Sequence, residues 1–261
     1  MRIATFNING VKARLEALST WLSEEQPDVV CLQEIKSVDE GFPAEPLQSL
    51  GYNVETHGQK GFNGVAILSK RPLEIVRRGL PGDPDDVQAR YIEALVPGDE
   101  GGAVRVASLY LPNGNPLGTE KFTYKCAWMQ RLAAHAAELM ALEEATVLAG
   151  DYNIIPEPVD ARTPANWVDD ALFQPESRGF WRSLMAAGWT DAVRAVTDSD
   201  HVYTFWDYQA GAWNRDEGIR IDHLALSPEA ADRLESVAIH AHVRGREKPS
   251  DHVPVVADIR I

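Results

Sequence analysis

A carboxylate and a carboxamide stand two positions apart after an apolar run, in ATVLAGDYNIIPEP at residues 145–158. The run is short and partly β-branched, which predicts a buried strand over 145–149, and Gly150 frees the backbone just before Asp151 and Asn153. Because side chains alternate along an extended chain, both polar groups are predicted to point the same way. An ordinary turn at a strand end remains the alternative, since Asp, Asn and Gly are common turn residues.

Polar side chains follow other predicted apolar strands in the same manner. The full set is Asn7, Glu34, Tyr110, Asp151, Asn153, Asp222, Asp251 and His252. If the strands pack as sheets, their ends can meet at one rim, where loops carry function on a rigid scaffold. A lone Glu34 is more often a solvated cap, whereas an unpaired carboxylate inside an apolar strand, as at Asp222, would cost several kcal/mol and is expected to have a partner.

The chemistry of this set favours a hard cation. It is rich in oxygen and contains one histidine and no cysteine, which suits magnesium or manganese much better than zinc. A hard cation among carboxylates indicates phosphoryl chemistry, in which metal and positioning stabilise charge on phosphate oxygens.

Strands and a few helices must position these side chains. Predicted strands cover 2–9, 29–34, two short segments around a glycine-rich turn within 51–70 with Lys60 at its tip, 86–96, 103–111, 145–149, 203–208, 219–226, 236–243 and 253–260. Predicted helices cover 11–25, 119–142 and 178–187.

Length and composition bound the class of protein. The 261 residues are enough for a sizeable core, and no linker, charge block or repeat marks a boundary, so a single domain over 1–261 is predicted. Cys31 and Cys126 are the only cysteines and lie in apolar settings, which fits free thiols in a reducing compartment. No segment is long and apolar enough for a signal peptide or membrane span, so a cytoplasmic protein with no membrane partner is expected.

The net charge of −14, from 25 basic and 39 acidic residues, argues against a polyanionic partner. A carboxylate cluster that holds cations would contribute to this total, and a bound metal would reverse the local sign. A basic face around the metal rim is therefore predicted, formed by Lys60, Arg77, Arg78, Arg90, Lys121, Lys125, Arg215, Arg220, Arg244, Arg246 and Lys248.

Eight stretches of the chain carry a resemblance to a known family. FNINGVKAR, LQEIK, GYNVETHGQKGFNGVAILSK, RRGLPGD, LPNG, LAGDYNI, IRIDHLALS and EKPSDHVPV, in this order, resemble the exonuclease III family of abasic-site endonucleases. That family belongs to the superfamily of endonucleases, exonucleases and metal-dependent phosphatases. The resemblance implies a DNase I-like α/β fold, a four-layer sandwich of two packed mixed, mainly antiparallel β-sheets flanked by helices. It also implies that the protein is a monomer.

The resemblance also implies roles for the polar set. Asn7 and Glu34 would be magnesium ligands, and Asp251 would help to hold the metal or its water. Asp151 would position or deprotonate the attacking water, and Asn153 would hold that water or a phosphate oxygen. Two-metal versions of the mechanism give the last two residues a metal as well, so one or two Mg²⁺ ions, with Mn²⁺ as a substitute, are expected.

The remaining implied roles concern the phosphate and the DNA. His252, oriented by Asp222, would contact the scissile phosphate, and Tyr110 would donate a hydrogen bond to the phosphate or the leaving oxygen. The implied backbone contacts are Arg90, Asn113 and Lys121, and the residues implied near a pocket for an extruded sugar are Phe205, Trp206 and Trp213. Core packing is the alternative for Phe205 and Trp206, because YTFWDY alternates like a sheet strand.

Three functions remain to be compared. The resemblance favours magnesium-dependent hydrolysis of duplex DNA 5′ to abasic sites, together with trimming of damaged 3′ ends. A phosphodiesterase or phosphatase acting on nucleotides, RNA or lipid headgroups is the alternative within the superfamily. A DNA-damage binding module without catalysis is disfavoured, because a competent residue fills every chemical position. The balance of endonuclease and exonuclease action depends on the loops 113–120, 156–178 and 209–218.

Overall fold

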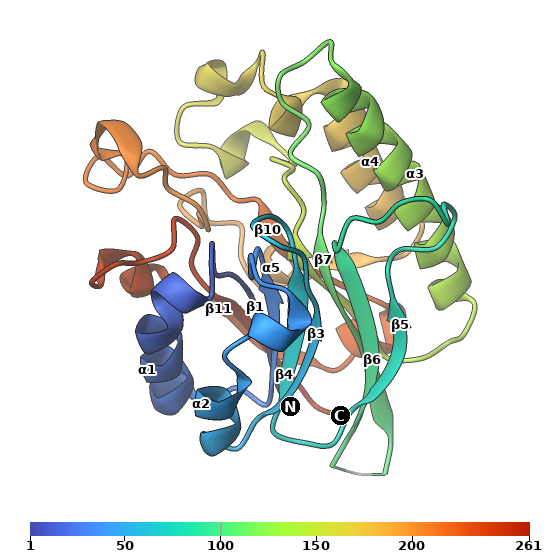
Figure 1. The fold of residues 1–261 in the computed structure, drawn as a ribbon. Helices are drawn as coiled ribbons and strands as arrows, with labels where there is room; N and C mark the ends of the chain where they lie inside the picture. The colour runs from blue at the N-terminus through green and yellow to red at the C-terminus, as the bar shows by residue number, and fades with distance from the viewer. Residues whose placement is uncertain (100) are drawn as a thin grey trace.

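Alternating apolar side chains build two β-sheets that pack face to face in the computed structural model of the chain, which describes residues 1–99 and 101–261 (Figure 1). The first sheet has the order β11-β12-β1-β2-β4-β3. Its strands are β1 (Arg2–Asn7), β2 (Val29–Gln33), β3 (Asn53–His57), β4 (Val65–Ser69), β11 (Leu234–Ile239) and β12 (Val255–Ile259). Only β1 and β2 pair in parallel among these strands.

The second sheet has the order β5-β6-β7-β8-β10-β9. Its strands are β5 (Glu74–Arg78), β6 (Tyr91–Pro97), β7 (Ala103–Tyr110), β8 (Thr146–Asp151), β9 (Thr190–Asp191) and β10 (Asp222–Leu226). One pair, β7 and β8, is parallel and the others are antiparallel. The predicted architecture of two mixed, mainly antiparallel sheets is therefore confirmed.

Helices cover the outer faces of both sheets (Figure 1). They are α1 (Leu15–Glu25), α2 (Ala44–Ser49), α3 (Glu120–Met140) and α4 (Pro175–Ala186), whereas the short helices α5 (Ala192–Val196) and α6 (Pro228–Ala231) contribute buried residues to the cluster between the sheets. The apolar faces of α1 and α2 pack on the first sheet, and those of α3 and α4 pack on the second. None of the helices in the described ranges is long and apolar enough to cross a bilayer.

The two faces of a central strand such as β1 enter different cores, as the period of two requires. In β1, Ile3 joins the cluster between the sheets, whereas Ala4 and Phe6 join the cluster beneath α1. The inter-sheet cluster draws on strands of both sheets. That residues 1–261 form one domain stays a prediction.

Several predicted strand boundaries are wrong. Residues 203–208 form no strand and make only isolated bridges through Phe205 to Ile219 and His252. A cause is Thr204, whose hydroxyl accepts hydrogen bonds from two backbone N–H groups at the start of β10, so a side chain replaces a ladder contact. Residues 86–90 precede β6, because the Asp86 carboxylate accepts from the backbone N–H of Gln88 and turns the chain.

Other differences concern the remaining short elements. The sequence reasoning missed β5, where half-buried and exposed residues alternate along the charged EIVRR. It also predicted strands over 219–226 and 236–243. In the structure these strands, β10 and β11, begin at Asp222 and Leu234.

Candidate active site

Three adjacent strands of the second sheet bring Tyr110, Asp151 and Asp222 into one row. The β7–β8 register pairs Tyr110 with Asp151, and the β8–β10 register pairs Asp151 with Asp222. Residues directly opposite each other in neighbouring strands project their side chains to the same face. The row is therefore a consequence of strand register.

Asn7, at the end of β1 in the first sheet, joins this row across the inter-sheet space. Its Nδ2 donates hydrogen bonds to Glu34 Oε1 and to Asp151 Oδ2, both at 2.9 Å. Its Oδ1 accepts from the backbone N–H of Asn9 at 3.0 Å. The side chain is fully buried, so one carboxamide fixes two carboxylates from different sheets.

Glu34 follows β2 in the left-handed conformation, with φ of 49°, which turns its side chain toward Asn7. Its Oε2 lies 3.0 Å from Lys36 Nζ. Burial acts to raise the pKa of Glu34, but the hydrogen bond from Asn7 and the positive charges of Lys36 and His252 outweigh it and lower this pKa. Glu34 is therefore ionised and ready to bind a cation.

Asp151 is 1% exposed and lies among other acids. Its Oδ1 accepts from the backbone N–H of Asn153 at 2.9 Å. Burial, together with the negative charges of Asp222 and Glu34, raises the pKa of Asp151 to about 7, although the charge of His252 acts in the opposite direction. A cation bound here would stabilise the ionised form.

His252 lies between two carboxylates. Its Nδ1 is 2.9 Å from Asp222 Oδ2 and its Nε2 is 3.7 Å from Asp151 Oδ2. Burial acts to lower the pKa of His252, but the charges of Asp222 and Asp151 outweigh it and raise this pKa to about 10. The imidazole is therefore protonated at neutral pH, with Nδ1–H donating to Asp222, which is the partner that this buried carboxylate was expected to have.

Asn153 lies beside Asp151, but the predicted reason was wrong. The strand ends at Asp151 and Asn153 has φ of 47°, so a left-handed turn rather than strand alternation brings the two residues together. The Asn153 Nδ2 donates to the carbonyl of Leu111 at 2.9 Å, and its Oδ1 accepts from Asn113 Nδ2 at 3.2 Å.

Asp251 lies apart from the compact part of the site. Its Oδ1 accepts from Asn9 Nδ2 at 3.0 Å, and Asn9 Oδ1 in turn accepts from Lys36 Nζ at 2.5 Å. Among the described residues, the group of side chains whose ligand atoms all lie within 4.8 Å of one another consists of Glu34, Asp151 and His252. Asp251 is thus linked to Glu34 only through two intervening side chains, Asn9 and Lys36.

The donor set fits a hard divalent cation. Glu34 and Asp151 offer carboxylate oxygens, the ligands that Mg²⁺ prefers, while Asn7 turns its amide nitrogen toward both carboxylates and its oxygen toward the backbone N–H of Asn9. The protonated His252 has no lone pair to give a metal and faces the same space as a hydrogen-bond donor. This combination suits an anion held between a metal and an imidazolium.

Tyr110 is half-buried and stacks on Arg90, whose guanidinium carbon lies 4.8 Å from the ring centre. Burial, with the negative charges of Glu34 and Asp151, raises the pKa of Tyr110 well above its ordinary value, so the phenol keeps its proton. Arg90 Nη1 also donates to the Tyr110 carbonyl at 3.2 Å. Arg90 therefore supports Tyr110 directly.

A hollow of about 510 Å³ contains the three residues that the sequence assigned to the DNA backbone. Asn113 and Lys121 are exposed there, and Arg90 is half-buried. The exposed aromatic ring of Phe62, on the turn between β3 and β4, lines the same hollow. This surface can accept an extended anionic chain.

The three aromatic residues proposed for a sugar pocket occupy different environments. Phe205 packs edge-on against His252, with ring centres 5.0 Å apart. Trp206 is only 2% exposed and belongs to the core beneath the first sheet, so it does not line a pocket at the site. Trp213 is half-buried and packs at 4.9 Å against Trp206.

The predicted basic face is only partly present. Lys125, Arg220 and Arg244 are buried and bound inside the protein, so they cannot meet a ligand at the surface. Their partners are backbone carbonyls for Lys125 and Arg244, and the carboxylates of Asp160 and Asp191 for Arg220.

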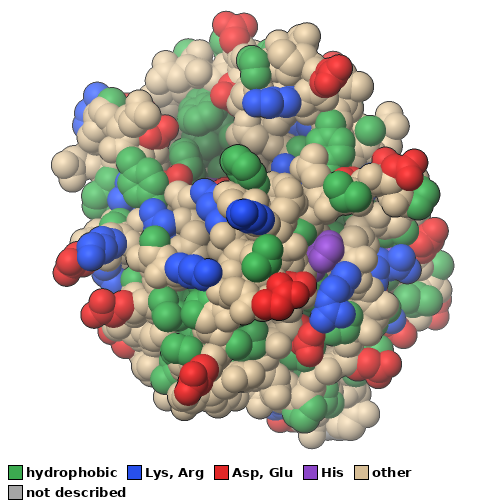
Figure 2. Space-filling view, in the orientation of Figure 1, with side chains coloured by type: hydrophobic (Ala, Val, Ile, Leu, Met, Phe, Trp, Pro, Cys, Tyr) green, Lys and Arg blue, Asp and Glu red, His purple; other side chains and the backbone are tan. Residues whose placement is uncertain are grey.

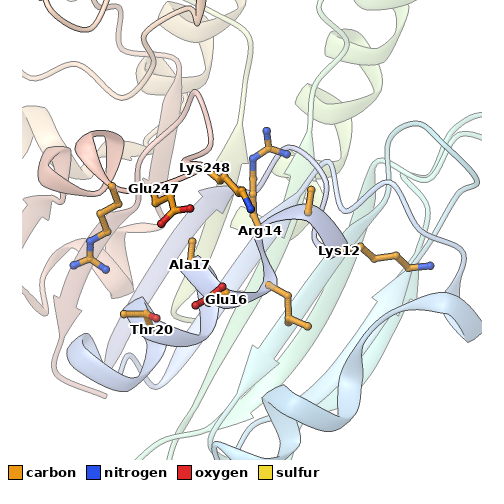
Figure 3. Close-up of a pocket in the computed structure, with 10 residues that line it drawn as sticks. Lys12, Arg14, Glu16, Ala17, Thr20, Glu247 and Lys248 are labelled. Atoms are coloured by element: carbon orange, nitrogen blue, oxygen red, sulfur yellow. The ribbon is translucent and has the colours of Figure 1, made fainter.

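Other cations gather close to the site. Lys and Arg side chains lie near one another on the middle of one face, with most acidic side chains toward its edges (Figure 2). A groove of about 530 Å³ beside the start of α1 is lined by Lys12, Arg14, Arg246 and Lys248, with Glu16 and Glu247 opposing them (Figure 3). Arg14 Nε donates to the carbonyl of Pro249, two residues before Asp251, so this groove adjoins the site.

Sequence reasoning missed Lys36, Arg14 and Thr204. Lys36 and Arg14 lie within the stretches LQEIK and FNINGVKAR, next to residues that were selected, but as lone cations near strand ends they carried no signal of their own. Thr204 had no signal because its contacts are with the backbone of β10, 17 and 18 residues away.

Comparison with known proteins places this geometry in context. Residues 4–252 match the family described as "Endonuclease/Exonuclease/phosphatase family". The chain is 35% identical to exodeoxyribonuclease III of Haemophilus influenzae, with all of both chains covered. It resembles the structure of an AP endonuclease from Archaeoglobus fulgidus at 34% identity and a TM-score of 0.92, with both chains fully covered. It also resembles a Neisseria 3′ phosphatase bound to a product DNA hairpin, at 36% identity and a TM-score of 0.93 over 99% of each chain.

Proposed function

The chain belongs to the endonuclease/exonuclease/phosphatase family and is a phosphodiester hydrolase of the exodeoxyribonuclease III and AP endonuclease type, and on this premise we propose its substrate and mechanism. The proposed activity is magnesium-dependent hydrolysis of duplex DNA 5′ to abasic sites, with removal of nucleotides or blocking groups from damaged 3′ ends. Relatives that carry the names exodeoxyribonuclease III, AP endonuclease and 3′ phosphatase, each at 34% identity or more over nearly the whole chain, support this proposal.

Glu34 and Asn7 are the residues proposed to hold the metal, and Asp251, which is hydrogen-bonded to Asn9, would help to hold the metal or its water. Bound magnesium would supply Lewis-acid stabilisation of a phosphate oxygen and lower the pKa of its water. Mn²⁺ can substitute, because it accepts the same oxygen ligands. In a two-ion version, Asp151 and Asn153 would hold the second ion.

Asp151 is proposed to orient the attacking water and to accept its proton. The carboxylate is suited to this role because Asn7 and the backbone of Asn153 fix both of its oxygens. Its raised pKa makes it a better proton acceptor than an exposed aspartate. Asn153 would hold the same water or a phosphate oxygen with its carboxamide.

His252 is proposed to bind the scissile phosphate as a cation. Asp222 holds Nδ1, so Nε2–H points toward Asp151 and the space where a phosphate would lie. Hydrogen bonds from a charged donor to a developing phosphate charge are strong in a site that excludes water. Tyr110, protonated and supported by Arg90, would donate to the phosphate or the leaving oxygen.

The DNA would follow the hollow containing Asn113 and Lys121 on one side of the site and the basic groove beside α1 on the other. Salt-dependent contacts to phosphates supply most of the affinity in such interfaces, and they need only local positive charge. Phe205, edge-on to His252, is the aromatic residue best placed to contact an extruded sugar that carries no base.

The observation that carries the proposal is the joining of Glu34, Asp151 and His252 within one site, with Asp222 holding the imidazolium. The test is a cleavage assay with magnesium on an abasic-site duplex, a blunt duplex and a duplex with a 3′ phosphate, with EDTA as the control. Cleavage 5′ to the abasic site that EDTA abolishes is expected. Cleavage only of free nucleotides, RNA or a phosphoinositide would overturn the proposed substrate, and tight DNA binding without cleavage would overturn catalysis. A monomeric state and a cytoplasmic location remain predictions.

A further inference from the structure

One buried ammonium group adjoins the site and has no role in the mechanism above. Lys125 of α3 is fully buried, and its Nζ donates hydrogen bonds to the backbone carbonyls of Asn153 at 2.6 Å, Asn113 at 3.1 Å and Ala171 at 3.3 Å. An ammonium has three N–H donors and no acceptor, so these carbonyls use its full capacity. The three carbonyls belong to segments that are distant in sequence: the turns after β7 and β8, and the loop before α4.

A lysine in this position is costly. Burial lowers the pKa of Lys125 to about 7, although the charges of Asp170 and Asp151 partly offset that effect. An apolar side chain would avoid this cost, but it would leave the carbonyls of Asn113 and Asn153 without this donor, which is also unfavourable, whereas Ala171 would keep its hydrogen bond from Ser177. The ammonium therefore stabilises the backbone conformation of the loops whose carbonyls it binds.

Packing around the lysine is equally specific. Gly114 lies so close that a Cβ atom there would be 2.6 Å from Cδ of Lys125, and its φ is 89°. Asn115 ties the same turn to the loop before α4, accepting from the backbone N–H of Ala171 and donating to Asp170, both at 3.0 Å. The turn after β7 is thus closed around the lysine side chain.

The hydrogen bond from Lys125 to the Asn153 carbonyl connects the lysine to the proposed reacting groups. Asn153 is held in the left-handed conformation, its backbone N–H donates to Asp151, and its carboxamide meets Asn113. Movement of the Asn153 carbonyl would therefore displace the carboxamide of the same residue.

We propose that Lys125 is a positioning residue: its ammonium group fixes the backbone at Asn153 and Asn113 and thereby aligns the Asn153 carboxamide with Asp151 and the reacting phosphate. The kinetic part of this inference rests on the proposed function. The structural part, the fixing of the loops, does not.

The test is a double-mutant cycle with Lys125→Met and Asn153→Ala on the abasic-site duplex, measured on the full chain in saturating magnesium. Displacement of a reacting group by about 1 Å can cost about 100-fold in rate, so Lys125→Met alone is expected to lower kcat by that order. In the Asn153→Ala background it should lower kcat by less than about 3-fold, since the group that it aligns is gone. Equal losses of kcat in both backgrounds, or no loss in the single variant, would overturn the proposal.

Leu132→Ala is the matched control. Leu132 lies on the same helix, is fully buried and packs in the core between α3 and the second sheet. This variant should lower thermal stability without lowering kcat well below its Tm, and its effect should be independent of Asn153→Ala. If Lys125→Met does not fold, Lys125→Gln, which keeps two N–H donors, is used in the same cycle with a smaller loss expected.

Amide hydrogen exchange separates this inference from the proposed function. In Lys125→Met, segments 111–115 and 151–155 should exchange at least 10-fold faster than in the wild type, whereas Leu132→Ala should not show this local change. A wild-type protein that cleaves no DNA would refute the proposed function, and exchange would then decide the role of Lys125 alone. Unchanged exchange in both segments would refute that role.

Discussion

Replacement of Asp222 by asparagine should change the pH range in which the protein works. In the wild type, the charges of Asp222 and Asp151 raise the pKa of His252 from its ordinary value of 6.5 to about 10. That difference favours the protonated imidazole by roughly 5 kcal/mol. The folded pKa is raised, so this contribution to stability is fully present below pH 6.5 and is lost as the pH rises toward 10.

The expected loss follows from the protonated fraction. At pH 8 a group with a pKa of about 10 is about 99% protonated, whereas one with a pKa of 6.5 is about 3% protonated. With a pKa of 6.5 in the variant, Asp222→Asn should therefore lower kcat about 30-fold at pH 8 but less than about 2-fold at pH 6 from protonation alone. In the variant, burial still lowers the pKa of His252 while Asp151 and Asp251 still raise it, so the ordinary value of 6.5 serves for the comparison.

The assay is the pH dependence of kcat between pH 5.5 and 9.5 on the abasic-site duplex, with the His252 titration followed by NMR. Asp258→Asn is the control, because this half-exposed carboxylate lies on β12 and contacts Arg2 and Ser236. A loss of the same size at every pH in Asp222→Asn, with His252 still titrating near pH 10, would refute the assignment of Asp222 as the group that keeps His252 charged.

Further predictions concern Asp151 and the aromatic residues. Asp151→Asn should abolish turnover and largely spare DNA binding. It should also raise Tm in metal-free buffer at pH 8, because burial raises the pKa of the Asp151 carboxyl to about 7 and its ionised form is therefore destabilising at pH 8. An unchanged or lower Tm would contradict this reasoning. Mg²⁺ should bind more weakly at pH 6 than at pH 8 in calorimetry, since Asp151 is largely protonated below pH 7, and pH-independent affinity would exclude Asp151 from any metal role. Phe205→Ala should lower kcat/KM for the abasic duplex more than for a 3′-phosphate duplex, whereas Trp206→Ala should cost about 3–5 kcal/mol of stability with no such preference.

Much of the site could be predicted because it stands where apolar strands stop. Asn7, Glu34, Asp151 and Asp222 follow or begin runs of buried residues, and sheet packing brings such ends together. The partner of Asp222 could also be predicted in kind, since a buried carboxylate needs one, and the structure identifies it as His252.

The rest depends on contacts that leave no local pattern. Trp206 and Phe205 are neighbours in the same aromatic segment, yet one lies in the core and the other against His252, because that segment is irregular rather than a strand. Lys125 and Arg220 read as surface cations in the sequence, but each neutralises or satisfies groups on loops that only the folded chain brings near. Whether a charged side chain faces inward is decided by these distant partners.

The bridge that Asn7 makes between Glu34 and Asp151 gives the protein an intrinsic safeguard. The groups proposed to act in hydrolysis extend from residue 7 to residue 252 and come from both sheets, so a chain that lacks either end of this range cannot assemble them. A nuclease whose site is assembled in this way cannot cleave DNA until the chain is complete and folded. Two inactive fragments that regain cleavage on mixing would therefore report, through DNA scission, that the two sheets had reassembled.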